Sequence, residues 1–163
     1  GADIGRIFGI ANPSDLAAIK MDLSDPHFGG KSVVAIEFAT GEMLIYKPKD
    51  LALEAAYFRF TTWLNTLGAD PTFPVLKILE RDGYGWVEFV DNRPCDSDEQ
   101  VGRFYRRSGA LLCLLYAFNG TDFHFENLIA CAEYTAPPVS AWHDWVACPC
   151  SIPPTSVATS RPR

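Results

Sequence analysis

The sequence predicts an α+β protein in which antiparallel hairpins alternate with helices. Strand-like segments are separated by short glycine turns, at residues 39–42 and 82–83, so neighbouring strands are expected to pair locally as hairpins. Helical periodicity occupies the stretches between the hairpins rather than following each single strand. Local pairing of this kind favours α+β over a doubly wound parallel sheet.

Composition narrows the class of protein. The 163 residues are enough for one domain with a core, and no apolar run reaches the ~18 residues of a membrane span. The net charge of −6 argues against a nucleic-acid groove but allows a small, locally basic phosphate site. Five scattered cysteines indicate a reducing, cytoplasmic compartment, and Cys113, in an apolar helical run, is expected in the core. No secretory signal is visible, and the initial Gly is consistent with a chain that begins inside a larger gene product.

The first half predicts an opening hairpin. Residues 1–20 carry mixed signals and are expected as a helix or an irregular approach segment. A turn containing Gly29 and Gly30 then leads into a strand at about 32–38. The "ATGE" turn follows, and the strand "EMLIYK" ends at Pro48, which has no N–H to donate.

A helix is predicted from residue 51 to Gly68. Asp50 is a good N-cap, and the glycine is a natural C-terminal stop. Apolar residues recur at helical spacing along this segment: Leu53, Tyr57, Phe60, Leu64 and Leu67.

The second half predicts a hairpin, a connector and an apolar helix. Two strands flank the Asp82-Gly83 turn, and residues 91–100 form a polar connector. A helix over 101–118 leads to a polar loop and the short strand "LIA". One side of this helix carries Val101, Phe104, Ser108, Leu111, Leu115 and Phe118.

The remaining residues read differently. Residues 131–163 lack a sustained period and are dense in Pro, Ser, Thr and Cys, which is typical of a linker or of sequence read in a shifted frame. The expected organisation is therefore an approach segment over 1–20, one folded unit over 21–130, and an irregular tail over 131–163.

A possible phosphate site lies in the opening hairpin and the helix after it. Glycines in "DPHFGGKS" let backbone N–H groups approach a phosphate, although an ordinary hairpin turn is the alternative. Lys47 shares a strand face with Met43 and Ile45, so its ammonium either reaches water or is held toward an anion. A strand lysine followed by a helix carrying Glu54 is the arrangement of the protein-kinase amino-terminal lobe.

The loop "GTDFHFENLIA" strengthens the kinase-like interpretation. Kinase catalytic loops hold a base aspartate and a metal-binding asparagine five positions apart, the spacing of Asp122 and Asn127. The asparagine carbonyl suits Mg²⁺. A solvated loop capped by Asp122 is the alternative. His124 is either a second acid–base group or a residue that hydrogen-bonds the loop.

Five blocks between Ser24 and Ala130 carry a family resemblance: "DPHFGGKSV", "LIYKPKDLALEAAY", "YGWVEFVDNRPC", "RFYRRSGALLCLLY" and "GTDFHFENLIA". They resemble the dehydratase domain of the type 2 lanthipeptide synthetases, the LanM family. The resemblance implies a lipid-kinase-like fold that uses ATP and Mg²⁺ to phosphorylate Ser and Thr of a ribosomally made precursor peptide. Phosphate is then eliminated to give dehydroalanine or dehydrobutyrine, a step of lantibiotic biosynthesis, and a separate zinc-dependent cyclase domain follows.

The resemblance also implies a role for each matching residue. The nucleotide would lie at the glycine-rich loop and the strand lysine, with its helix glutamate partner, and the catalytic loop would supply the base, an assisting histidine and a metal ligand. The residues of the glycine-rich loop are Asp25, His27, Gly29 and Gly30, and the strand lysine and its partner are Lys47 and Glu54. In the catalytic loop the base is Asp122, the assisting histidine is His124 and the metal ligand is Asn127.

The chain departs from the family pattern after "ENLIA". The family continues through a short hairpin to a strand ending in an Asp-Leu-Glu type motif, whose aspartate holds Mg²⁺. Here Asp144, in "HDW", is the only aspartate beyond Asn127. We therefore interpret the chain as a partial dehydratase domain that is inactive by itself. The alternatives are a non-catalytic remnant that binds only nucleotide or peptide, and a small-molecule kinase with a related loop.

Overall fold

The computed structural model describes residues 2–21, 32–119 and 128–136. Their helices and strands follow in the order α1 (Ala2–Phe8), β1 (Leu16–Lys20), β2 (Val34–Phe38), β3 (Met43–Lys47), α2 (Ala52–Thr66), β4 (Ile78–Arg81), β5 (Tyr84–Glu88), α3 (Asp98–Ala117), β6 (Ile129–Cys131) and β7 (Tyr134–Ala136).

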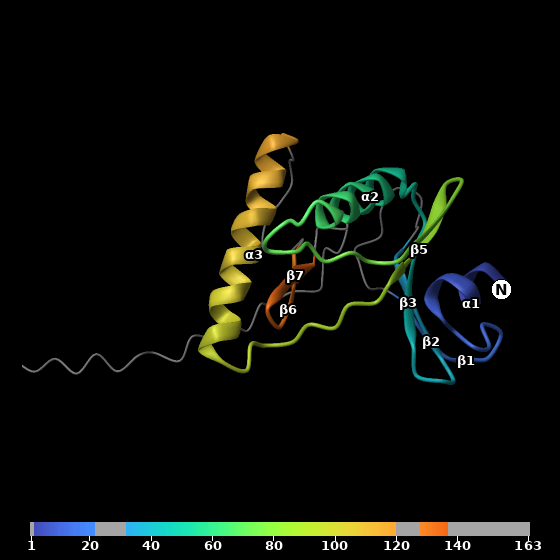
Figure 1. Cartoon of the computed structure of the whole chain (residues 1–163). Coiled ribbons are helices and arrows are strands. Elements are labelled where there is room, and N and C mark those ends of the chain that lie inside the picture. The colour runs from blue at the N-terminus through green and yellow to red at the C-terminus, as the bar shows by residue number, and fades with distance from the viewer. Residues whose placement is uncertain (1, 22–31, 120–127, 137–163) are drawn as a thin grey trace, which may run out of the picture.

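The main sheet is antiparallel, in the order β1-β2-β3-β5-β4. Both predicted hairpins are present, β2–β3 and β4–β5, and a direct β3–β5 pairing joins them. The α+β class with antiparallel pairing is therefore confirmed. In Figure 1, α1 and α2 lie on different sides of this sheet, and α3 stands apart from it beside the small β6–β7 hairpin.

Alternation along the strands builds two cores. The core on the α2 side joins residues of β2, β3 and β5 to Leu51 and Ile129; its buried members are Val33, Ala35, Ile45, Leu51, Val87 and Ile129. The core on the α1 side contains the alternate residues Phe38 and Leu44 together with Ile10. Period-two alternation thus decides which side chains of β3 face α2.

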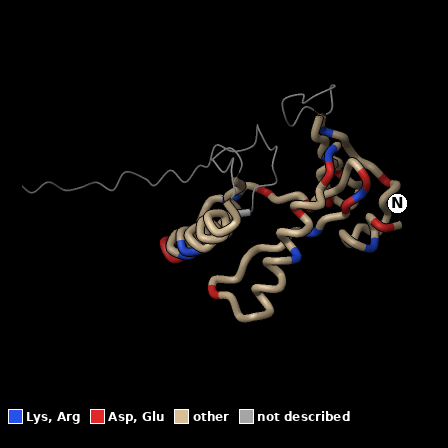
Figure 2. The backbone as a smooth tube through the Cα atoms, turned by 90° about the horizontal axis from the view of Figure 1, so that it is seen from above, with Lys and Arg blue, Asp and Glu red and all other residues tan. Residues whose placement is uncertain are grey.

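The first twenty residues belong to the sheet. β1 pairs with β2 in antiparallel register, from Lys20–Ala35 to Leu16–Phe38, with a bulge near its start. Asp3 in α1 forms an ion pair with Arg81 of β4. Figure 2 shows Lys and Arg interleaved with Asp and Glu around this part of the molecule.

The apolar residues that recur at helical spacing in α2 are not the residues that the helix buries. The buried residues of the helix are Glu54, Phe58 and Thr61, whereas Leu53 is 80% exposed. Polar residues occupy the inward stripe because each has a local partner: Lys49 pairs with Glu54, and the Thr61 hydroxyl bonds to helix carbonyls. An apolar count along the helix therefore selects a face rotated away from the true one.

The capping of α2 also differs from the prediction. Leu51 occupies the N-cap position and makes no side-chain capping bond. Asp50, predicted as the cap, instead accepts a hydrogen bond from the Ala52 N–H at 2.8 Å. The acid therefore still satisfies one N–H at the start of the helix.

Helix α3 begins at Asp98, inside the stretch predicted as a connector. Ser97 accepts a hydrogen bond from the Gln100 N–H, and the Gln100 side chain accepts one from the Asp96 N–H, a variant of the capping box. Its buried residues are Leu111 and Leu115. Cys113, expected in the core, is exposed, because the apolar run surrounds the helix and only one side of it meets the protein. Within the described residues, no helix has the length and apolar character needed to cross a membrane.

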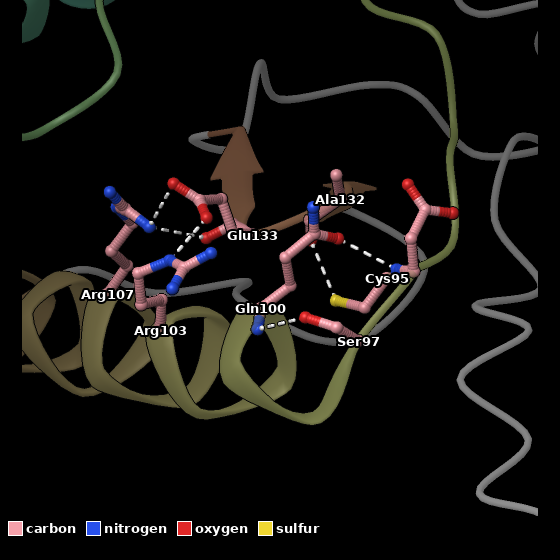
Figure 3. Close-up of polar contacts among 8 residues, drawn as sticks. Cys95, Ser97, Gln100, Arg103, Arg107, Ala132 and Glu133 are labelled. Atoms are coloured by element: carbon pink, nitrogen blue, oxygen red, sulfur yellow. Dashed lines mark hydrogen bonds and ion pairs between the residues drawn. The ribbon is translucent and has the colours of Figure 1, made fainter.

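The irregular tail does not begin at Cys131 as expected. β6 and β7 pair through Ile129–Ala136 and Cys131–Tyr134, across a turn in which Ala132 has a φ of 49°. The hairpin is attached to α3 through Glu133, which contacts Arg103 and Arg107, as Figure 3 shows. The predicted short strand at 128–130 is present as β6, shifted by one residue, whereas β7 was not predicted, because a three-residue strand is too short to show a period in the sequence. Residues 137–163 lie outside the described residues.

Candidate functional site

The candidate site is the interface between β3 and the start of α2. Lys47, the last residue of β3, is 0% exposed and lies on the strand face that also carries Ile45. This is the face predicted from strand alternation, and the core on that side includes Leu51 at the N-cap of α2. A lysine is rarely buried this fully unless its charge is compensated, so the position itself is informative.

Charges around Lys47 come from the neighbouring loop and from α2. Burial lowers the pKa of Lys47 well below its usual value, and the positive charge of Lys49 lowers it further. The carboxylate of Glu54 acts in the opposite direction and raises the pKa. Glu54 is itself buried, and its Oε1 lies 2.6 Å from the Lys49 Nζ. Two lysines thus share one buried carboxylate among the described residues.

Gly85 in β5 is the neighbour of Lys47 in the sheet. The two residues are directly paired in the β3–β5 register. A Cβ at Gly85 would overlap Leu51 Cδ1 and would lie 2.9 Å from the Leu79 carbonyl oxygen. The absence of a side chain at Gly85 therefore allows Leu51 and the start of α2 to pack closely against the sheet beside Lys47.

The arrangement has the chemistry of an anion site. The described cluster places two lysine amines around one carboxylate, in surroundings where burial strengthens electrostatic interactions. A compact ammonium with three donors suits phosphate oxygens, and the ion pair with Glu54 constrains the direction in which Lys49 points. A strongly perturbed lysine with a specific charge partner is typical of functional sites.

The remaining predicted site residues are not brought together by the described part of the structure. Asp25, His27, Gly29 and Gly30 fall within 22–31, and Asp122, His124 and Asn127 fall within 120–127; both segments lie outside the described residues. Their roles therefore remain predictions, including the metal-ligand role of Asn127.

Lys49 was missed by the sequence analysis. Its Nζ lies 2.6 Å from the Oε1 of Glu54, so it is an ion-pair partner of that carboxylate. The signal was present in "YKPKD", where Pro48 separates two lysines just ahead of the helix that carries the glutamate. The arginines of α3 were also not singled out, although "RFYRR" places three cations within five positions.

Comparison with known proteins agrees with the resemblance of the five sequence blocks. The DUF4135 family, described as a domain of unknown function, matches residues 2–137. The lacticin 481/lactococcin biosynthesis protein LcnDR2 of Lactococcus lactis subsp. lactis is 35% identical over 123 residues. The aligned part is 71% of this chain and 13% of that protein, so the chain spans a small share of its relative's length.

The chain therefore belongs to the DUF4135 family, and its identity with LcnDR2 relates it to the LanM-type proteins of lantibiotic biosynthesis.

Proposed function

We propose that the chain is the nucleotide-binding part of a lanthipeptide dehydratase, which phosphorylates Ser and Thr of a precursor peptide with ATP and then eliminates the phosphate. The observation that carries the proposal is the fully buried Lys47 beside Glu54, in a chain related to a lacticin 481 biosynthesis protein. A fold that only needed stability would gain little from this cluster, since buried ion pairs are weak stabilisers.

The described residues fit the phosphate end of a nucleotide. Lys47 is proposed to bind and orient phosphate oxygens, and Glu54 to hold it in place, with Lys49 balancing the glutamate when Lys47 turns to its ligand. Bound Mg²⁺ and ATP would supply the transferable phosphoryl group and neutralise its charge, with Asn127 as the proposed metal ligand. Kinase-like geometry across the whole domain is part of this proposal.

The catalytic loop is proposed to handle the protons. Asp122 would accept the proton of the substrate hydroxyl as its oxygen attacks phosphorus, and His124 would assist. In the second step the Cα proton of the phosphorylated residue is removed and phosphate leaves from Cβ, which creates the Cα–Cβ double bond. The downstream aspartate of the family pattern has no counterpart at the matching place, so we propose that the 163 residues alone do not complete the reaction.

The test is the mass of a Ser/Thr/Cys-rich precursor peptide after incubation with ATP and Mg²⁺. A protein in which the sequence continues as a LanM-type synthetase should add phosphate or remove water, and its Asp122→Asn variant should not. The 163-residue chain should leave the peptide unchanged. Loss of water with that chain alone would contradict the proposed incompleteness, and an inactive extended protein would contradict the function.

A further inference from the structure

A second cationic site lies between α3 and the segment that follows α2. A cavity of about 170 Å³ is lined there by Asp70, Pro71, Thr72, Arg103, Arg106 and Arg107. Arg106 and Arg107 follow Arg103 by three and four positions, so both are its neighbours on the surface of α3. This volume is below the ~300 Å³ at which pockets for nucleotide-sized ligands begin, so it suits a small anion.

Two of the arginines are held in place by the β6–β7 hairpin. Arg103 Nε and Arg107 Nη1 contact the two carboxylate oxygens of Glu133, at 2.5 and 3.0 Å, and Figure 3 shows both side chains directed to it. The Arg107 guanidinium also stacks on the Tyr134 ring at 4.2 Å. These contacts explain the geometry of the pair but leave the buried Arg107 Nε without a hydrogen-bond partner in the described structure.

The third arginine, Arg106, is paired with an exposed acid. Arg106 Nη2 lies 2.7 Å from the Asp70 Oδ2, and the side chain of Asp70 is 76% exposed. An ion pair this exposed is weak and exchangeable. Asp70 is therefore well placed to give way to a more highly charged oxyanion, because guanidinium groups bind phosphate in a bidentate manner.

We propose that this arginine cavity binds a phosphate group, with Asp70 occupying the position of the anion when none is bound. The cavity is separate from the Lys47 site. The phosphate could be inorganic or the phosphorylated side chain of a peptide, and only the second source rests on the proposed function.

The test follows the arginine Nε–H signals of the isotope-labelled 163-residue chain by NMR during titration with inorganic phosphate at constant ionic strength. Phosphate should shift the Arg107 signal saturably, and chloride should not. Arg106→Gln should weaken phosphate binding about tenfold or more, whereas Asp70→Asn should strengthen it up to about fivefold because the competing carboxylate is removed. Arg6→Gln removes another exposed, ion-paired arginine, in α1, and should change nothing.

Titration with a phosphoserine peptide then separates the two sources. Tighter binding of the peptide than of inorganic phosphate assigns the site to a phosphorylated substrate, and equal binding assigns it to free phosphate; either result supports the site. Lys47→Met should leave both curves unchanged, so the site can stand even if the proposed function fails. Non-saturable shifts, or equal losses in the Arg106 and Arg6 variants, would overturn the inference.

Discussion

Lys47→Met should stabilise the chain while removing the proposed phosphate ligand. Methionine fills the space of the lysine stem without a charge in an interior where burial disfavours that charge. Removing one member of a buried ion pair usually costs about 3–5 kcal/mol, but Glu54 retains Lys49 at 2.6 Å and is not left uncompensated. Removal of the buried charge should therefore raise the free energy of unfolding by about 1–2 kcal/mol at neutral pH, which is the lower part of the range for such replacements.

The pH dependence of stability gives this prediction a second readout. The pKa of Lys47 in the folded chain lies below its value in the unfolded chain, so between the two values the unfolded chain binds more protons. The free energy of unfolding of the wild-type chain should therefore rise with pH over the alkaline range that ends near 10.5, and this component should be missing in Lys47→Met. Measurements from pH 7 to 9.5 avoid the range in which tyrosines titrate.

Urea unfolding with a thiol reductant present is the assay. Lys47→Ala should be less stable than Lys47→Met by about 2–5 kcal/mol because it leaves a cavity. Lys77→Met, which replaces an exposed lysine, should change stability by no more than about 0.5 kcal/mol. A loss of about 3 kcal/mol in Lys47→Met would mean that Glu54 depends on Lys47, and an unchanged pH slope would mean that Lys47 is not the buried charge.

Three further predictions follow from single positions. Gly85→Ala should cost about 1–3 kcal/mol in urea unfolding because its Cβ would overlap the start of α2, whereas Gly109→Ala, which meets nothing within 4 Å in α3, should gain about 0.5–1 kcal/mol; equal effects would refute the close approach. Burial raises the pKa of Tyr57 to about 12, so the free energy of unfolding should fall as pH rises above 10, and this fall should be smaller in Tyr57→Phe. An equal fall in both proteins would mean that the Tyr57 hydroxyl ionises as easily in the folded chain as in the unfolded one. The double change Leu112→Lys and Tyr116→Lys, at residues 66% and 88% exposed, should reduce self-association in light scattering at unchanged stability; unchanged scattering would show that this face of α3 is not adhesive.

The sequence was sufficient to predict which side chains of a strand share a face of the sheet, because alternate residues of a strand point to the same side. The alternation of Met43, Ile45 and Lys47 correctly predicted that the lysine shares the face of Ile45, and the Asp82-Gly83 turn correctly predicted the second hairpin. Short glycine turns fix strand pairing locally, so both hairpins needed no knowledge of distant contacts.

Helix faces and the last hairpin were harder to read because contacts far away in sequence decide them. The inward stripe of α2 contains Glu54 and Thr61, whose burial depends on Lys49 and on carbonyls of the helix itself. The β6–β7 hairpin is organised by Glu133 reaching back to arginines of α3, roughly thirty positions earlier. Local periodicity carries no information about partners of this kind.

Labelling of the 163-residue chain with an acyl phosphate derivative of ATP tests the nucleotide site most directly. Such a reagent transfers its acyl group to a lysine amine next to the bound phosphates, and a depressed pKa makes the Lys47 amine more often neutral and nucleophilic. Peptide mapping should find the label on Lys47 or Lys49, and excess ATP with Mg²⁺ should suppress it. In Lys47→Met the label at position 47 should be absent. Labelling confined to exposed lysines such as Lys20 and Lys77, or labelling that ATP does not suppress, would contradict a nucleotide site between β3 and α2.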